Sequence, residues 1–566
     1  MSQSDQFNGR LGLIFASIGA AIGTGNIWRF PRMVGANGGG TFLIPWLIFL
    51  FAWSIPLVIA EYAMGKRSRT GTIGTFRIFA GRRFAWMGLW TAWISTAIGF
   101  YYAVVSGWTL KYFQLGITGA LNGEGVDTTE VWNAFLQSPG QVIFFQFIVI
   151  LLVLGTIWKG AKAIEKVNFY LMISLFALLF LTLFLSLWMD LSDGSLDGAL
   201  FMFTVDFDML MEPEVWINGL SQSAWSCSAG MGMCITYAVY MSKDEDTVLN
   251  AFTMGLANNS ISIIAGLAVL SAIFAVESDP LATVTGGSSA ITFLALPQVF
   301  AQAPGGVIGP LVMTAMFFLA LSFAALTSMI STVELCVRNF VDHGYDRERS
   351  VLITGLAIFI FGLPSAMLWI RLDDAGVAFP EFLEVQDHIW GYGLMFSGLF
   401  IAFSIWKYGY IKWRAAVDEG TAPPGFAGYL GLGVSAFRDD FINTGDNDIE
   451  VGRWWDVLIY VAFPVLFFIL MASYFSDMIA NTPNVWDPSN PKGLSIILLF
   501  WGVVAALFIG LNRKLIERPL YRNVPEGADA DISQLPGGSD KLIGQVGDVI
   551  AGFEHLSDSI DAELAD

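Results

Sequence analysis

The side chains of this sequence that could hold a small ion are neutral oxygen donors set inside long apolar stretches. Asn26, Ser226, Asn258, Thr327 and Ser328 carry amide or hydroxyl oxygens, and no Asp or Glu lies at the middle of the first, sixth or seventh apolar stretch. Hard cations bind oxygen ligands, and backbone carbonyls can complete such a shell. The set therefore predicts a sodium-type site without a carboxylate, although any one member could instead form a hydrogen bond between packed helices.

Catalytic and transition-metal chemistry is poorly represented. The three histidines are scattered at the ends of apolar stretches or near the C-terminus, and the three cysteines lie in apolar stretches without a CxxC pattern. No metal-ligand spacing or nucleophile and base arrangement results. The sequence therefore argues against an enzyme, because no catalytic cluster forms from its histidines and cysteines: His343, His388, His555, Cys227, Cys234 and Cys336.

The composition excludes an ordinary soluble protein. Of 566 residues, 55% are hydrophobic and only 14% are charged. Apolar runs long enough to cross a bilayer recur along the chain. They predict an all-α integral membrane protein of twelve spans, which begin near Leu11, Thr41, Trp86, Gln141, Val167, Val215, Val248, Val307, Val351, Ile389, Trp455 and Leu494.

Two of these spans carry helix-weakening residues. The first contains SIGAAIGTG at Ser17–Gly25, and the sixth contains Gln222, Ser223, Ser226, Ser228, Gly230 and Gly232. Backbone groups freed at membrane depth must be satisfied by protein, water, ions or substrate, so a broken span indicates a binding site. The two spans hold corresponding places in spans one to five and six to ten, which predicts an inverted repeat. Either cluster alone would more often mark close helix packing.

Loop charge orients the predicted spans. Met64–Ala85 has six basic residues and no acid, whereas Asp190–Glu214 has seven acids and no base. The positive-inside rule places the first loop and both termini in the cytoplasm of a multi-pass cell-membrane protein. The net charge of −19, with ten acids and only Lys541 after Pro525, excludes nucleic acid as a partner. Apolar residues at helical spacing in the tail predict either a short docking helix or a solvated segment: Ile543, Val546, Ile550, Phe553 and Ile560.

Several segments resemble the neurotransmitter:sodium symporter family. They are GAAIGTGNIWRFP at 19–31, NGGGTFLIPW at 37–46, EYAMG at 61–65, FYYAVVSGW at 100–108, ITYAVYMSKDED at 235–246 and AALTS at 324–328. The resemblance implies a LeuT-type fold, a 5+5 inverted repeat with broken helices 1 and 6. It divides the chain into a cytoplasmic segment (1–10), a transport core (11–410), a cytoplasmic loop (411–453), spans 11 and 12 (454–514) and an acidic cytoplasmic tail (515–566).

The resemblance also implies two sodium sites. The first would use Ala21, Asn26, Ser226 and Asn258, with a substrate carboxylate oxygen completing the shell. The second would use carbonyls of Gly19, Ile22 and Ala324 with the hydroxyls of Thr327 and Ser328. Loss of the second sodium would then permit inward opening.

A chloride site follows from one position. Ser262 lies one helical turn after Asn258. Its position resembles the one at which chloride-independent bacterial members of the family have a glutamate. A hydroxyl cannot supply that charge, so the resemblance implies a chloride bound by Trp46, Gln222, Ser226, Asn258 and Ser262. Trp46 departs from the family's usual tyrosine. In the alternative interpretation Ser262 is a packing residue, and protons or no anion balance the charge.

The substrate pocket implied by the resemblance suits a zwitterion. Gly23 stands where monoamine carriers have an aspartate, so a carboxylate or sulfonate is expected, beside the amides near Thr24 and Gly25. Trp225 replaces the usual lid phenylalanine and reduces the volume. We expect a small neutral α-amino acid first and a β- or γ-amino acid or taurine second, bound by Ala21, Gly23, Thr24, Gly25, Ile98, Tyr102, Trp225, Ser226, Ser228, Met231, Ser328 and Thr332.

The resemblance finally implies two gates. Arg29 and Asp387 resemble the outer charged pair; Phe7, Tyr240, Glu334 and Asp342 resemble the inner latch. Ser4 stands where the family has a basic partner for Asp342, and Arg10 could substitute. The fifth span also lacks the family's helix-breaking proline, since none occurs between Pro139 and Pro213. The prediction is sodium-coupled, chloride-dependent symport by alternating access, with a channel or a non-transporting amino-acid sensor as alternatives; the oligomeric state is not indicated.

Overall fold

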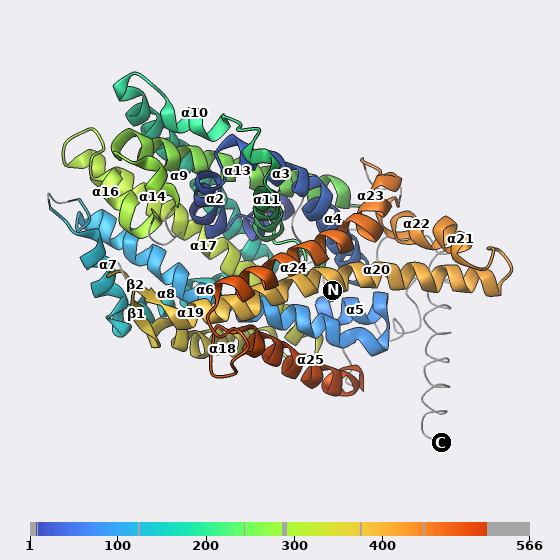
Figure 1. The fold of residues 1–566 in the computed structure, drawn as a ribbon. Coiled ribbons are helices and arrows are strands. Elements are labelled where there is room, and N and C mark those ends of the chain that lie inside the picture. Colours follow the sequence, from blue (N-terminus) through green and yellow to red (C-terminus); the bar gives the residue numbers. More distant parts are fainter. Residues whose placement is uncertain are drawn as a thin grey trace.

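The computed structural model describes Phe7 and residues 10–122, 125–242, 244–285, 291–373, 376–444 and 448–517. In these ranges the chain is a bundle of long helices (Figure 1). Its strands there are β1 (Ile370–Leu372) and β2 (Ala378–Pro380), which pair antiparallel with Arg371 opposite Phe379. The predicted all-α membrane class is confirmed.

The predicted spans correspond to helices in the structure. Ten helical stretches of the described residues are long and apolar enough to cross a membrane, and the bent pair Leu11–Ala21 and Gly25–Ala36 makes eleven. The interrupted sixth segment, α11 (Pro213–Ser226) and α12 (Met233–Ala238), completes the twelve. Its two helices, of 14 and 6 residues, are each too short to cross a membrane alone, because polar and glycine residues break the segment between them.

The first half of the chain supplies five of these spans and their connecting helices. Their bounds are α1 (Arg10–Ala21), η2 (Gly25–Arg29), α2 (Phe30–Ala36), α3 (Gly40–Phe49), η3 (Leu50–Ser54), α4 (Ile55–Ser68), α5 (Thr72–Ala80), η4 (Arg82–Phe84), α6 (Ala85–Thr118), α7 (Thr128–Leu136), α8 (Pro139–Ile157), α9 (Ala161–Asp190), η5 (Leu191–Asp193), α10 (Asp197–Phe203) and η6 (Met209–Met211).

The rest of the chain supplies the remaining spans. After α11 and α12 come α13 (Thr247–Val276), α14 (Pro280–Thr285), η7 (Ile291–Ala295), α16 (Leu296–Phe300), α17 (Ile308–Asp342), α18 (Arg347–Met367), α19 (Glu381–Gln386), η8 (Asp387–Gly391), α20 (Tyr392–Asp418), α21 (Phe426–Gly428), η9 (Tyr429–Gly433), α22 (Val434–Phe437), η10 (Arg438–Ile442), α23 (Arg453–Val457), η11 (Leu458–Ala462), α24 (Phe463–Asn481) and α25 (Leu494–Glu517).

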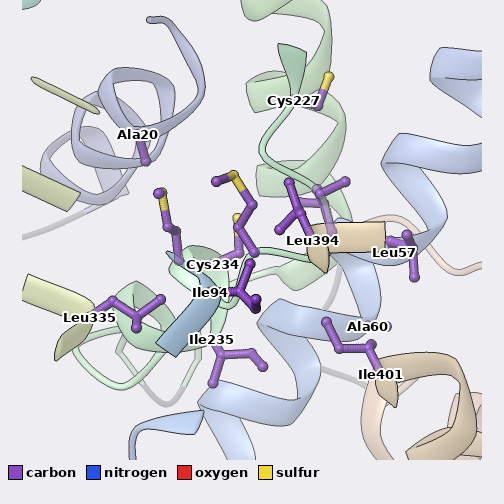
Figure 2. Packing of buried hydrophobic residues seen from close by; sticks show 14 of the residues in the cluster. Ala20, Leu57, Ala60, Ile94, Cys227, Cys234, Ile235, Leu335, Leu394 and Ile401 are labelled. Carbon is purple, nitrogen blue, oxygen red and sulfur yellow. The ribbon is translucent and has the colours of Figure 1, made fainter. Parts of the chain in front are cut away.

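The core forms around the two interrupted segments. The long helices α6 and α17 pack along each other, and α9 packs against both α13 and α17. Figure 2 shows apolar side chains from α1, α4, α6, α17 and α20 gathered around the broken sixth segment, including Ala20, Leu57, Ile94, Leu335 and Leu394. Large apolar side chains on α8, α9, α18, α24 and α25 are instead exposed, as expected where helices face lipid. Tight packing thus holds the breaks in one conformation.

The connection after the tenth span is more helical than its prediction as a loop. α20 continues past residue 410 and ends at Asp418, where Gly420 adopts a φ of +74°. Residues 426–442 then form α21, η9, α22 and η10, which pack back against α20. α25 ends at Glu517, and the tail with its predicted docking helix lies outside the described residues.

We name the two ends of the bundle by their residues. The inner end holds Arg69, Asp342 and Arg347, and the outer end holds Asp190 and Asp387. The Asp190 carboxylate accepts hydrogen bonds from the amides of Gly198 and Ala199 at the outer end. The predicted gates lie toward these two ends, on either side of the breaks.

Candidate functional site

The first broken span separates two helices that meet at 54°. α1 ends at Ala21 and the helix resumes at Gly25, while the Gly23 amide donates to Asn26 Oδ1 at 3.0 Å. A Cβ on Gly23 would lie 2.8 Å from Ser328 Oγ and 3.1 Å from the Tyr102 hydroxyl. Gly23 thus permits a close approach, whereas a Cβ on Gly25 would meet nothing within 4 Å.

The sixth span is broken at the same depth. Between Ser226 and Met233 the backbone takes positive φ at Ser228 (50°), Gly230 (88°) and Gly232 (81°). Such angles interrupt a right-handed helix, and for Ser228 they are unusual. Ser228 Oγ donates to the Ala20 carbonyl at 3.2 Å, which joins the two breaks. The predicted pair of broken helices is therefore confirmed, and they meet.

Three residues without a predicted role hold the sixth break in place. Buried Glu61 accepts a hydrogen bond from the Gly230 amide at 2.5 Å. Ser95 Oγ donates to the Met231 carbonyl at 2.6 Å, and Ser54 Oγ donates to the Ser223 carbonyl at 2.8 Å. A single acid inside an apolar span is a recognisable signal for such a role. The two serines carry no comparable signal in the sequence.

The predicted first cation set converges on Asn26. Its Nδ2 donates to Ser226 Oγ (3.2 Å), Asn258 Oδ1 (2.8 Å), the Asn258 carbonyl (3.3 Å) and Ser262 Oγ (2.8 Å). All four residues are buried. Ala21, also in this set, is the last residue of α1 at the break. The structure therefore gathers neutral oxygens from η2, α11 and α13 around one point.

The predicted second cation set bridges α1 and α17. Ser328 Oγ and Thr327 Oγ1 lie 3.1 and 3.4 Å from the Ile22 carbonyl, and Thr327 Oγ1 lies 3.0 Å from the Ala324 carbonyl. A Cβ on Gly19 would lie 3.2 Å from Thr327 Cβ. All five predicted residues are therefore neighbours.

The predicted anion set is only partly assembled. Ser226, Asn258 and Ser262 meet at Asn26, but no hydrogen bond among the described residues joins Gln222 or Trp46 to them. Gln222 Oε1 and Trp46 Nε1 are both buried without a partner there. Trp46 packs its ring on Phe30, with centroids 4.6 Å apart. Gln222 lies one turn before Ser226 on α11, so both point along the same face.

The predicted substrate residues surround the breaks. The Tyr102 hydroxyl accepts from the Thr24 amide at 3.1 Å and lies 3.3 Å from Thr24 Oγ1. Ile98 and Met231 are buried beside it, whereas the Thr332 hydroxyl donates to the Ser328 carbonyl of its own helix at 3.0 Å. The pocket wall is thus mostly apolar, with its polar groups near Thr24.

Comparison with known proteins matches this arrangement to a family. The chain fits the model of the "Sodium:neurotransmitter symporter family" over residues 4–135 and 136–427. The chain belongs to the sodium:neurotransmitter symporter family.

Individual relatives of this symporter support that assignment. It is 31% identical to the sodium-dependent transporter YhdH of Bacillus subtilis, over 71% of this chain and 88% of the relative. It is 30% identical to the sodium-dependent transporter MJ1319 of Methanocaldococcus jannaschii, over 84% and 90%. The solved structure of MhsT in complex with L-phenylalanine is 28% identical, with a TM-score of 0.67, over 83% of this chain and 99% of MhsT.

The predicted outer gate residues, Arg29 and Asp387, do not pair with each other in the described part of the chain. Arg29 Nη2 donates to Ser221 Oγ at 3.0 Å, and Asp387 Oδ1 accepts from the Tyr101 hydroxyl at 2.6 Å. No ion pair joins Arg29 to Asp387 in the described part of the chain. The lid residue Trp225 lies against span ten, because a Cβ on Gly391 would come within 2.8 Å of its ring.

The inner gate residues of the symporter are tied together. The Phe7 amide donates to the Tyr240 carbonyl at 3.2 Å, and the Tyr240 hydroxyl donates to Glu334 Oε1 at 2.5 Å. Asp342 pairs with Arg338 at 2.7 Å. Arg338 therefore supplies the cation that Ser4 lacks; Ser4 and the Arg10 side chain lie outside the described residues.

Two further arginines reinforce the inner end. Arg347 pairs with Glu334 at 2.5 Å. Arg69, just beyond α4, donates from Nη1 to the carbonyls of Val239 (3.0 Å) and Met241 (2.5 Å). Burial of its guanidinium lowers the pKa of Arg69 to about 10. Sequence reasoning missed these cations, since basic residues near span ends also serve to orient spans.

Proposed function

We propose that the chain is a sodium-coupled, chloride-dependent symporter of a small neutral amino acid. Alternating access would occur around the two broken helices, with both termini cytoplasmic in the cell membrane and with the core, loop and tail boundaries given above. The observation that carries the proposal is the convergence of neutral oxygens on Asn26 without a carboxylate. Such a shell has no negative charge to balance a bound sodium ion. A substrate carboxylate and a halide would provide negative charge beside it.

The first sodium would take the place of the Asn26 amide nitrogen. The two ends of an amide exchange by a half-turn of the side chain. After that turn Asn26 Oδ1 would face Ser226 and Asn258, and these oxygens, with the Ala21 carbonyl, would become cation ligands. A substrate carboxylate beside Thr24 would complete the shell, so that sodium and substrate bind together. This supports tight coupling of ion and amino acid.

The second sodium would lie between α1 and α17. Oxygens of Ile22, Ala324, Thr327 and Ser328 already lie within hydrogen-bonding distance of one another. Gly19 is packed against Thr327 and would add its carbonyl. A cation there would hold the two helices together, and its loss would release α1.

The amino acid would bind between the breaks. Its carboxylate would meet the helix N-terminus at Gly25, where the helix dipole favours an anion, and the Tyr102 hydroxyl. Gly25 faces open space, while Gly23 is closed off by Ser328 and Tyr102. Ile98, Met231 and the large Trp225 ring limit the side-chain volume. The complex of MhsT with L-phenylalanine supports an amino-acid substrate.

Chloride would bind next to the first sodium. Ser262 Oγ and the side chains of Ser226 and Asn258 lie around the same point. Trp46 brings a buried, unpartnered indole N–H on a neighbouring helix, which can donate to an anion, and the Gln222 amide would have to turn its Nε2–H₂ group to the halide. A halide there would balance the sodium charge in the way that a glutamate at position 262 would.

Uptake by purified protein in proteoliposomes tests the proposal. We expect accumulation of a labelled small neutral amino acid to require an inward sodium gradient and external chloride, with choline and gluconate as replacements. Accumulation that persists in choline would overturn sodium coupling. Counterflow separates the remaining classes: a carrier exchanges labelled substrate, a channel passes uncoupled current, and a sensor binds without flux.

A further inference from the structure

Asn168 is a buried amide that lies against the Tyr237 hydroxyl without a well-formed hydrogen bond. It lies on α9, its side chain is 0% exposed, and neither Oδ1 nor Nδ2 has a hydrogen-bond partner in the described residues. A buried polar group without a partner costs roughly 1–3 kcal/mol. An unpaired amide with this burial therefore indicates a ligand that is absent when the helices are closed.

The amide adjoins the second cation set. A Cβ on Gly19 would lie 3.5 Å from Asn168 Nδ2 and 3.2 Å from Thr327 Cβ. Asn168 thus faces the same residue of α1 that packs on Thr327, but from α9. It lies seven residues from the inner start of α9, so it is placed on the inner side of the site.

A line of polar side chains continues from this point to the inner end. On α17, Thr327, Ser331 and Glu334 follow at intervals of four and three residues, so they share one face and span about 10 Å. Ser331 Oγ donates to the Thr327 carbonyl at 3.0 Å.

Two tyrosines of the sixth span and its inner end lie along that face. The Tyr237 hydroxyl is 2.7 Å from Ser331 Oγ and lies beside Asn168. The Tyr240 hydroxyl donates to Glu334, which is 0% exposed. Oxygens therefore occur at short intervals from the second cation set to the paired acid.

α9 itself offers no backbone route. It is one continuous helix from Ala161 to Asp190, and its sequence contains no proline. Its carbonyls remain in the helix, so a cation that leaves the second site must use side-chain oxygens. Asn168 is the side chain of α9 placed to offer one.

We propose that Asn168 Oδ1, with the hydroxyls of Ser331 and Tyr237, forms a transient sodium station between the second sodium site and the inner end. Sodium leaving Thr327 and Ser328 binds these oxygens before it reaches Glu334. The station would be filled only during release. The inference rests on the proposed second sodium site.

Asn168→Leu tests the station. It preserves volume and removes both polar atoms, so release slows while binding from outside is retained. Since a hydrogen-bonded charge is worth about 1.5–3 kcal/mol, net uptake turnover should fall about tenfold or more. Exchange with saturating sodium on both sides, which needs no net release, should fall less than about threefold. The sodium concentration for half-maximal thermal stabilisation should stay within about twofold of the parent.

Controls separate this role from a structural one. Ser186→Ala removes another buried, unpartnered polar atom of α9, four to five turns closer to the outer end, and should leave all three measurements unchanged. Asn168→Ser keeps an oxygen and should restore part of the net uptake. Equal loss of net uptake and exchange in Asn168→Leu, or unchanged net uptake, would overturn the station.

The same assays distinguish failure of the underlying site. Thr327→Val should raise the sodium concentration needed for thermal stabilisation. If Thr327→Val raises that concentration while Asn168→Leu has the same net uptake as the parent protein, the second sodium site is supported and the station is refuted. If Thr327→Val has no effect on sodium dependence, the proposed second site itself is refuted, and the station with it.

Discussion

The inner and outer ends of this symporter are closed by different kinds of contact. At the inner end, buried carboxylates meet guanidinium groups directly, as in Glu334 with Arg347 and Asp342 with Arg338. At the outer end Arg29 and Asp387 are each held by a hydroxyl, from Ser221 and Tyr101. Breaking a buried ion pair leaves an unpaired charge in the protein interior, whereas a hydrogen bond to a hydroxyl can be replaced by another partner at lower cost. In this structure ion pairs therefore hold the inner end, and hydroxyl contacts hold the predicted outer gate residues.

The loop after span ten adds to this asymmetry. Asp246 Oδ1 caps the start of α13 through the amides of Val248 and Leu249 at 2.8 Å. Its Oδ2 accepts from the Asp448 and Ile449 amides at 2.6 and 3.2 Å. One buried carboxylate therefore ties the segment before α23 to the inner end of the seventh span.

The largest effect is expected from Glu334→Gln. The change removes the negative charge that pairs with Arg347 but keeps an amide oxygen that can accept from Tyr240, and loss of one partner of a buried pair costs about 3–5 kcal/mol. The inner end should open, and net uptake should fall more than about a hundredfold. Thiol labelling of a cysteine introduced at Phe7 should accelerate correspondingly.

An exposed pair provides the control for Glu334→Gln. Lys492 and Glu384 form an ion pair of 2.6 Å near the outer end, with Glu384 47% exposed. Glu384→Gln should change uptake by less than about twofold, because exposed pairs contribute 0–1 kcal/mol. If the two variants behave alike, burial does not distinguish the two ends and the comparison fails.

Thr327→Val should have the next largest effect. It retains shape but removes the hydroxyl that faces the Ile22 and Ala324 carbonyls, and the sodium concentration for half-maximal uptake should rise about tenfold. The matched control is Thr314→Val on the same helix, whose hydroxyl contacts Asn122 instead. A sodium dependence equal to that of the control would remove Thr327 from the cation set.

Ser262→Glu should change anion dependence more than rate. The carboxylate would place a fixed charge beside Asn26, so uptake in gluconate should reach at least about half of that in chloride. Ser262→Ala lacks the charge and should stay chloride-dependent. Halide dependence that is the same in both variants and the parent would exclude Ser262 from the anion site.

The sequence was sufficient to predict the broken helices but not the ion pairs of the inner end. Gly and Ser clusters inside apolar spans are local signals, so the breaks at Gly23 and Gly230 could be predicted, and so could the neighbours Thr327 and Ser328 through resemblance. The spacing of Arg338 and Asp342 on α17 is a local signal that sequence reasoning missed. The Arg347 partner of Glu334, in contrast, depends on how α18 approaches α17, which no local pattern encodes. The same holds for Asn168, whose burial without a partner is a property of the packed bundle.

The smallest effect is expected from Ser221→Ala at the outer end. Its hydroxyl holds Arg29 Nη2 and also contacts the Tyr474 hydroxyl at 2.7 Å. Without it Arg29 is free to pair with Asp387, so the apparent substrate affinity should rise about twofold to threefold, as expected for one neutral hydrogen bond. Asp387→Asn in the same background should abolish the gain, because the pair then has no acid. A gain in affinity that persists in Asp387→Asn would show that Ser221 does not act through the pair of Arg29 and Asp387. The difference between the two ends would then not be explained by ion pairs at one end and hydroxyl contacts at the other.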